Sequence, residues 1–310
     1  MPRVFDKKNV IIAKIDEVDL KSYLVDSDLN DCGSRSFLFP ELASVIINAI
    51  PEYVFASYVD PVIPQTDAVE RLREAAKSIY KIKDFDLMKR ALIDRDDTAI
   101  AELKTKKNNR GEFGEILLHL LLRDFHETIP LISKVYFKDS TGVPAHGFDA
   151  VHISPVEKAL WLGESKFYSD SKEGIKALIE DINHHFIKDY LNEQILVIKK
   201  NLGCNEIPQR DDWIKKLNES SKLSDQLSII NIPLLCIYPH NIYSLFDDLN
   251  VKDAVTCHET NARELKKHFD DNNNHPNKSA LNIILLLFPV KDKKELAKML
   301  HEKLWYMQNM

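Results

Sequence analysis

The stretch that decides the fold is His146–Phe167, which reads HGFDAVHISPVEKALWLGESKF. Its two ends are dominated by apolar and small residues, which predicts two short strands, His146–Ile153 and Ala159–Phe167. Charged residues nevertheless interrupt both strands, because Asp149 lies in the first and Glu164-Ser-Lys166 lies in the second. Charges inside strands that otherwise look buried need a physical reason.

The surrounding elements extend this pair of strands into a sheet. A helix is predicted over Gly111–Phe125 and a strand over Ile132–Lys138, and a long helix over Ser171–Lys200 is followed by an apolar strand over Ile229–Tyr238. The order is helix, three strands, long helix, strand. We therefore expect a meander with a later strand beside it, that is, an α/β (α+β) fold with a central mixed sheet flanked by helices.

The N-terminal third has a different character. Short strands are predicted over Val10–Ile15 and Ser22–Val25, and the pattern becomes helical after residue 66. We therefore divide the chain into a mixed, mostly helical N-terminal region (1–108) and a second region (109–310) that ends in further strands and a helix.

Composition excludes several classes of protein. The 310 residues include 42 Lys and Arg against 48 Asp and Glu, a net charge of -6, which excludes a uniformly basic nucleic-acid coat. Only 8 Gly and 13 Pro argue against low-complexity disorder and a turn-rich all-β fold. The 4 Cys form no CxxC pair, which fits a reducing cytoplasm. No apolar run approaches the roughly 20 residues of a membrane span, so no membrane association is expected.

The three charged residues of the strands form a plausible catalytic group. Because strand residues alternate between faces, Glu164 and Lys166 point the same way, and Asp149 lies beside Glu164 if the two strands pair. Unpaired buried charge costs on the order of several kcal/mol, and a divalent cation between the carboxylates would offset that cost. Oxygen ligands with open positions suit Mg²⁺ or Mn²⁺.

Such a site could hydrolyse a phosphodiester. The metal would neutralise developing charge and lower the pKa of a bound water, and Lys166 could orient or deprotonate that water or stabilise the charge. Glu112 or Glu115, at the start of the preceding helix, could complete the metal shell. The simpler alternative is that Glu164 and Lys166 pair as surface charges at a sheet edge.

The motifs also carry a resemblance. The runs RGEFGEILLHLLL, VPAHGFDAVHI and LWLGESKFY resemble the PD-(D/E)xK nuclease superfamily and, within it, the HamA family, the nuclease subunits of the Hachiman anti-phage defence system. The resemblance implies a restriction-endonuclease-like core with Asp149 and Glu164 as metal ligands and Lys166 as the catalytic lysine. It also implies Glu115 as the helix acid, with Glu112 in reserve. One departure is Phe148, which stands where the superfamily's name places a proline.

The resemblance further implies a function. It indicates a Mg²⁺-dependent deoxyribonuclease of the bacterial cytoplasm that acts on DNA and is restrained and activated through a HamB-like helicase. Two alternatives stay open: a catalytically silent docking module for a helicase, and a standalone restriction-type endonuclease.

Several further residues are candidates for secondary roles. Basic residues on either side of the motif are candidates for DNA contact; the alternative is that they are ordinary solvated surface charges. They are Lys104, Lys106, Lys107, Arg110, Lys172 and Lys176. Strand alternation places His152 on the face opposite Asp149, where we expect it to satisfy a hydrogen bond. His184 and His185 are expected on a solvated face of the long helix.

Overall fold

The described part of the chain has strands first and a helix last, with helices and strands interspersed between them. The computed structural model describes residues 10–55, 67–79, 87, 89–91, 94–99, 111–133, 147–202, 209–219 and 222–310. The first elements are β1 (Ile11–Asp16), β2 (Leu20–Val25), β3 (Ser27–Leu29), β4 (Arg35–Phe37), α1 (Phe39–Asn48), α2 (Ile50–Phe55) and α3 (Ala68–Ile79). The central elements are α6 (Glu112–Phe125), β5 (Ile129–Ser133), β6 (Ala150–Ser154), β7 (Ala159–Phe167), α7 (Ser171–His185), α8 (Lys188–Leu202), α9 (Arg210–Glu219) and α10 (Leu223–Leu227). The last are β8 (Ile230–Pro239), α11 (Ile242–Leu245), α12 (Lys252–Asn272), a short 3-10 helix (Lys278–Ala280), β9 (Asn282–Val290) and α13 (Lys293–Gln308).

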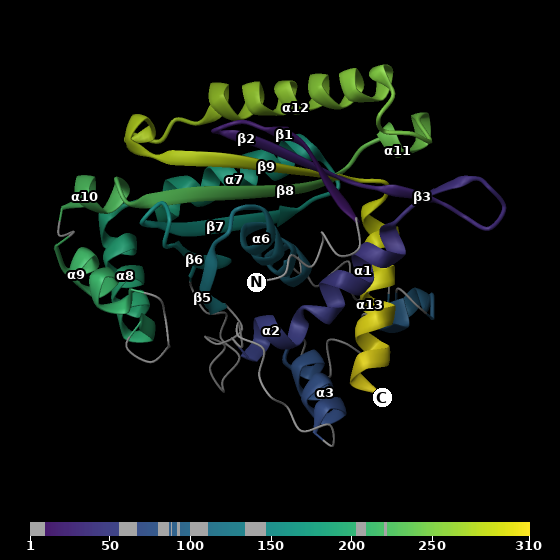
Figure 1. Ribbon diagram of the computed structural model, residues 1–310, viewed down its shortest axis with the longest axis horizontal. Helices are drawn as coiled ribbons and strands as arrows, with labels where there is room; N and C mark the ends of the chain where they lie inside the picture. Colours follow the sequence, from purple (N-terminus) through teal and green to yellow (C-terminus); the bar gives the residue numbers. More distant parts are fainter. Residues whose placement is uncertain are drawn as a thin grey trace.

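Within the described residues, seven strands form one sheet in the order β1-β2-β9-β8-β7-β6-β5 (Figure 1). The strands β5, β6 and β7 form an antiparallel meander, whereas β7, β8, β9 and β2 run parallel to one another. The central strands β8 and β9 are buried along most of their length, as expected of parallel strands that helices cover on both faces. The predicted mixed central sheet flanked by helices is confirmed.

Helices cover the two faces of the sheet as separate layers. One core cluster joins α1, α2, α3, α6 and α13 to residues such as Trp161, and the other joins α7, α8, α9 and α12 to residues such as Leu160 and Leu162. Figure 1 shows α12 on one side of the sheet and α1 and α13 on the other. Since successive residues of β7 face opposite layers, Glu164 and Lys166 share the face of Leu160 and Leu162, towards α7.

A bilayer-spanning element is not among the described helices. None of them combines the length and the apolar character that crossing a membrane requires.

The N-terminal strands belong to the same sheet as the rest. Residues Leu20–Ser22 of β2 pair in parallel with Leu285–Leu287 of β9, and α1 and α2 share a core with α6 and α13. Residues on both sides of the predicted boundary at 108/109 therefore share one sheet and one core. The boundary itself lies outside the described residues.

The predicted order of helix, three strands, helix and strand is present, and β7 has the predicted bounds. The prediction of one long helix over Ser171–Lys200 is wrong, because α7 ends at His185 and α8 begins at Lys188. Phe186 leaves the helical conformation at φ -101° and ψ 38°, and its buried ring packs 5.3 Å from that of Phe148. Burial of this ring therefore accompanies the break.

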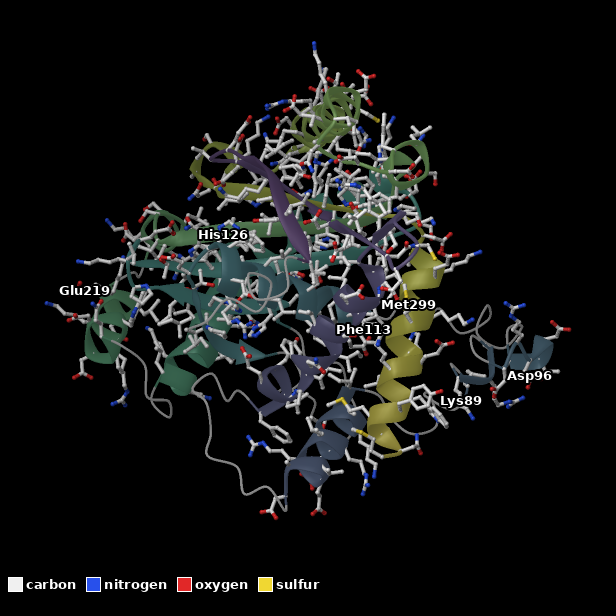
Figure 2. The ribbon with its side chains drawn as sticks, turned by 45° about the vertical axis from the view of Figure 1, so that its right-hand side comes forward. Lys89, Asp96, Phe113, His126, Glu219 and Met299 are labelled. Carbon is white, nitrogen blue, oxygen red and sulfur yellow. The ribbon has the colours of Figure 1, made fainter. Side chains whose placement is uncertain are left out.

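The C-terminal helix holds the start of α6 in place. The ring of Phe113, in the first turn of α6, lies 5.2 Å from the ring of His301 in α13. Figure 2 shows Phe113 beside α13, with Lys89 against the same helix, where its ammonium lies 4.9 Å from the centre of the Trp305 ring. α13 therefore packs against α6 and also contacts Lys89.

The sheet and α6 are tightly packed at Gly163 of β7. A Cβ at this position would lie 2.9 Å from Cγ of Pro233 and 3.0 Å from Cδ2 of Leu118. Both neighbours belong to packed elements, so only glycine fits here without a shift of α6 or β8.

We expect Gly163→Ala to lower the free energy of unfolding by about 1–3 kcal/mol, the usual cost of overpacking a core. Urea denaturation measures this loss. Gly147→Ala is the matched control, since its Cβ would meet only the end of the Gln194 side chain, at 3.4 Å. Equal midpoints for Gly163→Ala and the parent would contradict the packing described here.

Candidate active site

Two carboxylates lie side by side where β6 begins. In the antiparallel pair of β6 and β7, Ala150 is opposite Gly163, and one more step in this register places Asp149 opposite Glu164. Both acids are buried, with 5% and 3% of their surface exposed. Oδ2 of Asp149 accepts hydrogen bonds from the backbone N and the Oγ of Ser165, each at 2.9 Å. The start of β6 is thereby fastened to β7 next to Glu164.

Lys166 brings a positive charge to the same place. Its Nζ lies 2.5 Å from Oδ2 of Asp181 in α7. Burial lowers the pKa of Lys166, but the negative charges of Asp181, Glu164 and Asp149 outweigh it and leave the pKa above its usual value. The side chain is therefore a charged ammonium that interacts electrostatically with three carboxylates.

α7 supplies a second contact, one turn after Asp181. Nδ1 of His185 lies 2.7 Å from Oε1 of Glu164. The expectation of a solvated face holds for His184, which is exposed, and is wrong for His185, which is half-buried. Sequence reasoning also missed Asp181. The signal available was an acid and a histidine four residues apart, on the helix that directly follows the Glu164-Ser-Lys166 strand.

The first turn of α6 reaches the sheet between the two charged residues of β7. A Cβ on Gly114 would lie 3.2 Å from Oγ of Ser165, so the helix backbone touches β7 at this residue. The next residue, Glu115, is buried and accepts a hydrogen bond at 3.1 Å from the hydroxyl of Tyr53 in α2. Glu112 lies half-buried at the start of the same turn. Both predicted helix acids are thus on the layer opposite α7.

The chain matches a known family over nearly all of its length. The HamA family model covers residues 3–304. The chain belongs to the HamA family. It is accordingly a component of a Hachiman anti-phage defence system. No curated protein matches it.

The donor set of this HamA family member fits a divalent cation of the hard type. Asp149 and Glu164 are buried acids on adjacent strands; Oδ2 of Asp149 accepts from Ser165, and Oε1 of Glu164 lies 2.7 Å from Nδ1 of His185. Carboxylates that bind metals are commonly hydrogen-bonded by a second residue in this way. In the described part of the chain, no group of three or more His, Cys, Asp and Glu is arranged to hold a metal ion. Two carboxylates are a number that Mg²⁺ sites often use, with water and phosphate oxygens in the remaining positions.

The predicted DNA-contact residues fall into two groups. Lys172 and Lys176 are exposed on the first two turns of α7, directly after the site strand. The other four, Lys104, Lys106, Lys107 and Arg110, lie outside the described residues.

His152, the histidine of the HamA-like motif, lies in a buried polar network. Its Nδ1 is 2.8 Å from the hydroxyl of Thr128, and its Nε2 is 3.2 Å from Nδ1 of His119. His119 in turn contacts Glu52 of α2 at 3.3 Å, and Arg123 forms an ion pair with the same acid. The prediction that His152 satisfies a hydrogen bond is confirmed. The network ties β6, α6 and α2 together on the layer that carries Glu115.

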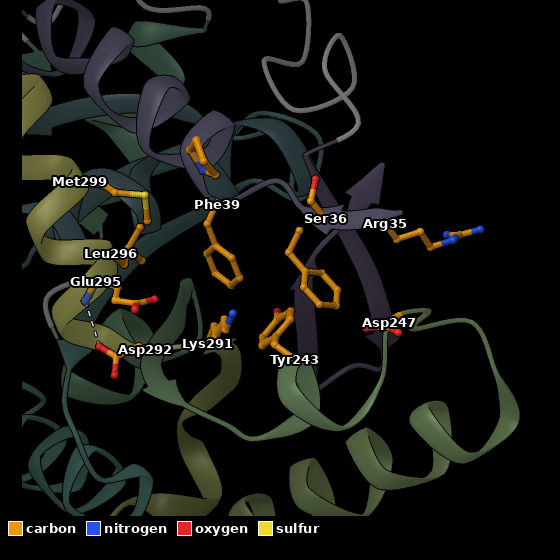
Figure 3. Close-up of a pocket in the computed structure, with 12 residues that line it drawn as sticks. Arg35, Ser36, Phe39, Tyr243, Asp247, Lys291, Asp292, Glu295, Leu296 and Met299 are labelled. Atoms are coloured by element: carbon orange, nitrogen blue, oxygen red, sulfur yellow. Dashed lines mark hydrogen bonds between the residues drawn. The ribbon is translucent and has the colours of Figure 1, made fainter. Parts of the chain in front are cut away.

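A separate cavity of about 390 Å³ lies between β4, α1, α11 and α13 (Figure 3). Its apolar wall includes the rings of Phe39 and Tyr243, and charged residues of both signs, such as Lys291 and Glu295, line its rim. Its lining contains none of the residues predicted for the active site.

The burial of His152 in this network predicts that the free energy of unfolding depends on pH. Burial and then the nearby His119 and Arg123 lower the pKa of His152 well below its usual value, so the folded protein holds the ring neutral. The unfolded chain protonates this histidine near pH ~6.5, so its contribution is present above that pH and is lost as the pH falls. We expect His152→Gln to flatten the loss of unfolding free energy between pH ~6.5 and 5, by up to about 1.4 kcal/mol per unit. Urea denaturation across this range measures the slope, and an unchanged slope would contradict a neutral buried His152.

Proposed function

We propose that this HamA family member is a metal-dependent DNA nuclease, the effector of its defence system, which a HamB-like helicase restrains and activates. The observation that carries the proposal is the meeting of Asp149, Glu164 and Lys166 at one end of the sheet. Two buried acids beside an ammonium suit phosphodiester hydrolysis, and membership of the HamA family supports the defence role.

In this proposal Asp149 and Glu164 hold one Mg²⁺ or Mn²⁺, each through a carboxylate oxygen. When bound, the ion neutralises charge on a phosphodiester and lowers the pKa of a water. Lys166 donates a hydrogen bond from its ammonium to that water or to a phosphate oxygen. The resemblance adds Glu115 to the shell, with Glu112 as the alternative acid. Both lie on the layer opposite α7 and form no three-residue metal group with Asp149 and Glu164 in the described part of the chain, so water and phosphate oxygens fill the remaining positions unless α6 shifts.

The charge of the chain favours a partner that delivers the DNA. The net charge of -6 opposes tight binding of free DNA, and attraction must come from local groups such as the exposed Lys172 and Lys176. A helicase that binds the DNA itself would supply the missing affinity. The isolated chain should therefore bind DNA more weakly than its complex with the helicase.

We expect Glu164→Gln and Lys166→Ala each to lower the rate of DNA cleavage by at least about 100-fold, because each removes a group that acts on the reacting phosphate. The assay is plasmid degradation by the chain with its helicase and Mg²⁺. The matched controls are Glu219→Gln and Lys215→Ala, exposed residues of α9. Parental rates in the folded site variants would contradict the proposal, and equal cleavage without the helicase would instead indicate a standalone endonuclease.

A second expectation concerns DNA binding. Replacing Lys172 and Lys176 together by Ala should weaken binding to every DNA sequence alike and should reduce the salt dependence of log K by up to about 2, roughly one per phosphate contact. Fluorescence anisotropy of the complex at several salt concentrations measures both effects. An unchanged salt dependence would show that neither lysine contacts a phosphate.

A further inference from the structure

The spacing of two residues on α7 matches the spacing of two site residues on β7. Asp181 and His185 are four residues apart on a helix, so they lie on one face about 6 Å apart along the axis. Glu164 and Lys166 are two residues apart on a strand, so they lie on one face roughly 6.6 Å apart. Because the two distances agree, the contacts from Lys166 to Asp181 at 2.5 Å and from Glu164 to His185 at 2.7 Å form side by side.

His185 is itself held in a fixed orientation. Its ring stacks on that of Tyr190, with centroids 4.5 Å apart and planes 13° apart. The ring of Phe148, the residue before Asp149, meets it edge-on at 5.7 Å. Tyr190 comes from α8, so the break between α7 and α8 is what brings this ring over His185. An aromatic frame of this kind fixes the direction in which Nδ1 points.

α7 has an apolar side that packs against the sheet independently of the two polar contacts. The apolar side of the helix is buried against the sheet through Ile175, Leu178, Ile179 and Ile182. Once desolvation is counted, an ion pair adds little net stability over an apolar pair of similar volume. A role in holding the charged residues of β7 explains Asp181 and His185 better than a role in attaching the helix.

We propose that Asp181 and His185 are positioning residues of the candidate active site: Asp181 holds the ammonium of Lys166, and His185 holds the carboxylate of Glu164. This inference rests on the proposed metal-dependent function. Without Asp181, the ammonium of Lys166 would turn to Asp149 and Glu164 and occupy the oxygens that a metal needs. Without His185, Glu164 would lose the contact at Oε1 that helps to orient its carboxylate.

The test is Mn²⁺ binding by isothermal titration calorimetry on the purified full chain, with melting temperatures measured in parallel. We expect Asp181→Asn and His185→Ala each to weaken Mn²⁺ binding by about 10- to 100-fold, as is usual when a partner of a metal ligand is removed. His185→Asn should restore most of the affinity, because its amide can donate from nearly the position of Nδ1. His184→Ala, on the exposed side of the same helix, is the matched control and should bind as the parent does.

A double variant separates positioning from general damage. Asp181→Asn should have no further effect in a Lys166→Ala background, because no ammonium is left to turn towards the ligands. If His185→Ala does not fold, His185→Leu fills the space without a donor and takes its place. Parental affinity in both single variants, or tighter binding, would overturn the positioning roles. A parent chain that binds no Mn²⁺ would overturn the proposed metal site as well, so the two failures are distinguishable.

Discussion

Two carboxylates buried next to each other are the constraint on which the rest of this structure depends. Asp149 and Glu164 lie opposite one another at the end of a strand pair, where an apolar interior strongly penalises unpaired charge. Three neighbours meet that penalty: Ser165 donates to Asp149, His185 contacts Glu164, and Lys166 supplies a positive charge near both. A divalent cation would complete the compensation. The proposed metal binding would thus serve the same compensation of buried negative charge that the fold already requires.

The elements around these acids supply the residues that hold them in place. β7 contributes Glu164, Ser165 and Lys166 in three successive residues, which alternate between the α7 layer and the α6 layer. α7 reaches the site from one side and the first turn of α6 from the other, at Gly114. Two glycines allow this close packing: Gly114 of α6 lies against Ser165, and Gly163 of β7 lies against the Leu118 side chain. Both layers are therefore needed to set the geometry of one small group of charges.

The sequence was sufficient for the local pattern of the core. Continuous apolar runs fix β7 to its observed bounds, and strand alternation places Glu164 and Lys166 on one face and His152 on the other. Pairings between distant residues could not be predicted in this way. The parallel pairing of Leu20 with Leu285 brings the N-terminal strands into the central sheet. No pattern in the sequence near either residue predicts this pairing. The surroundings of His185 were missed because apolar spacing favours one continuous helix. In the structure the helix breaks where Phe186 is buried, and the break brings Tyr190 over His185.

We propose that Asp149 and Glu164 together bind a divalent cation. A crystal of the chain soaked in Mn²⁺ tests this directly, because manganese gives an anomalous difference peak that other light atoms do not. We expect a peak within bonding distance of one oxygen from each of the two carboxylates, at about 2.0–2.3 Å. A well-occupied peak elsewhere with none at these acids, or Lys166 bonded to both carboxylates in the presence of Mn²⁺, would contradict it.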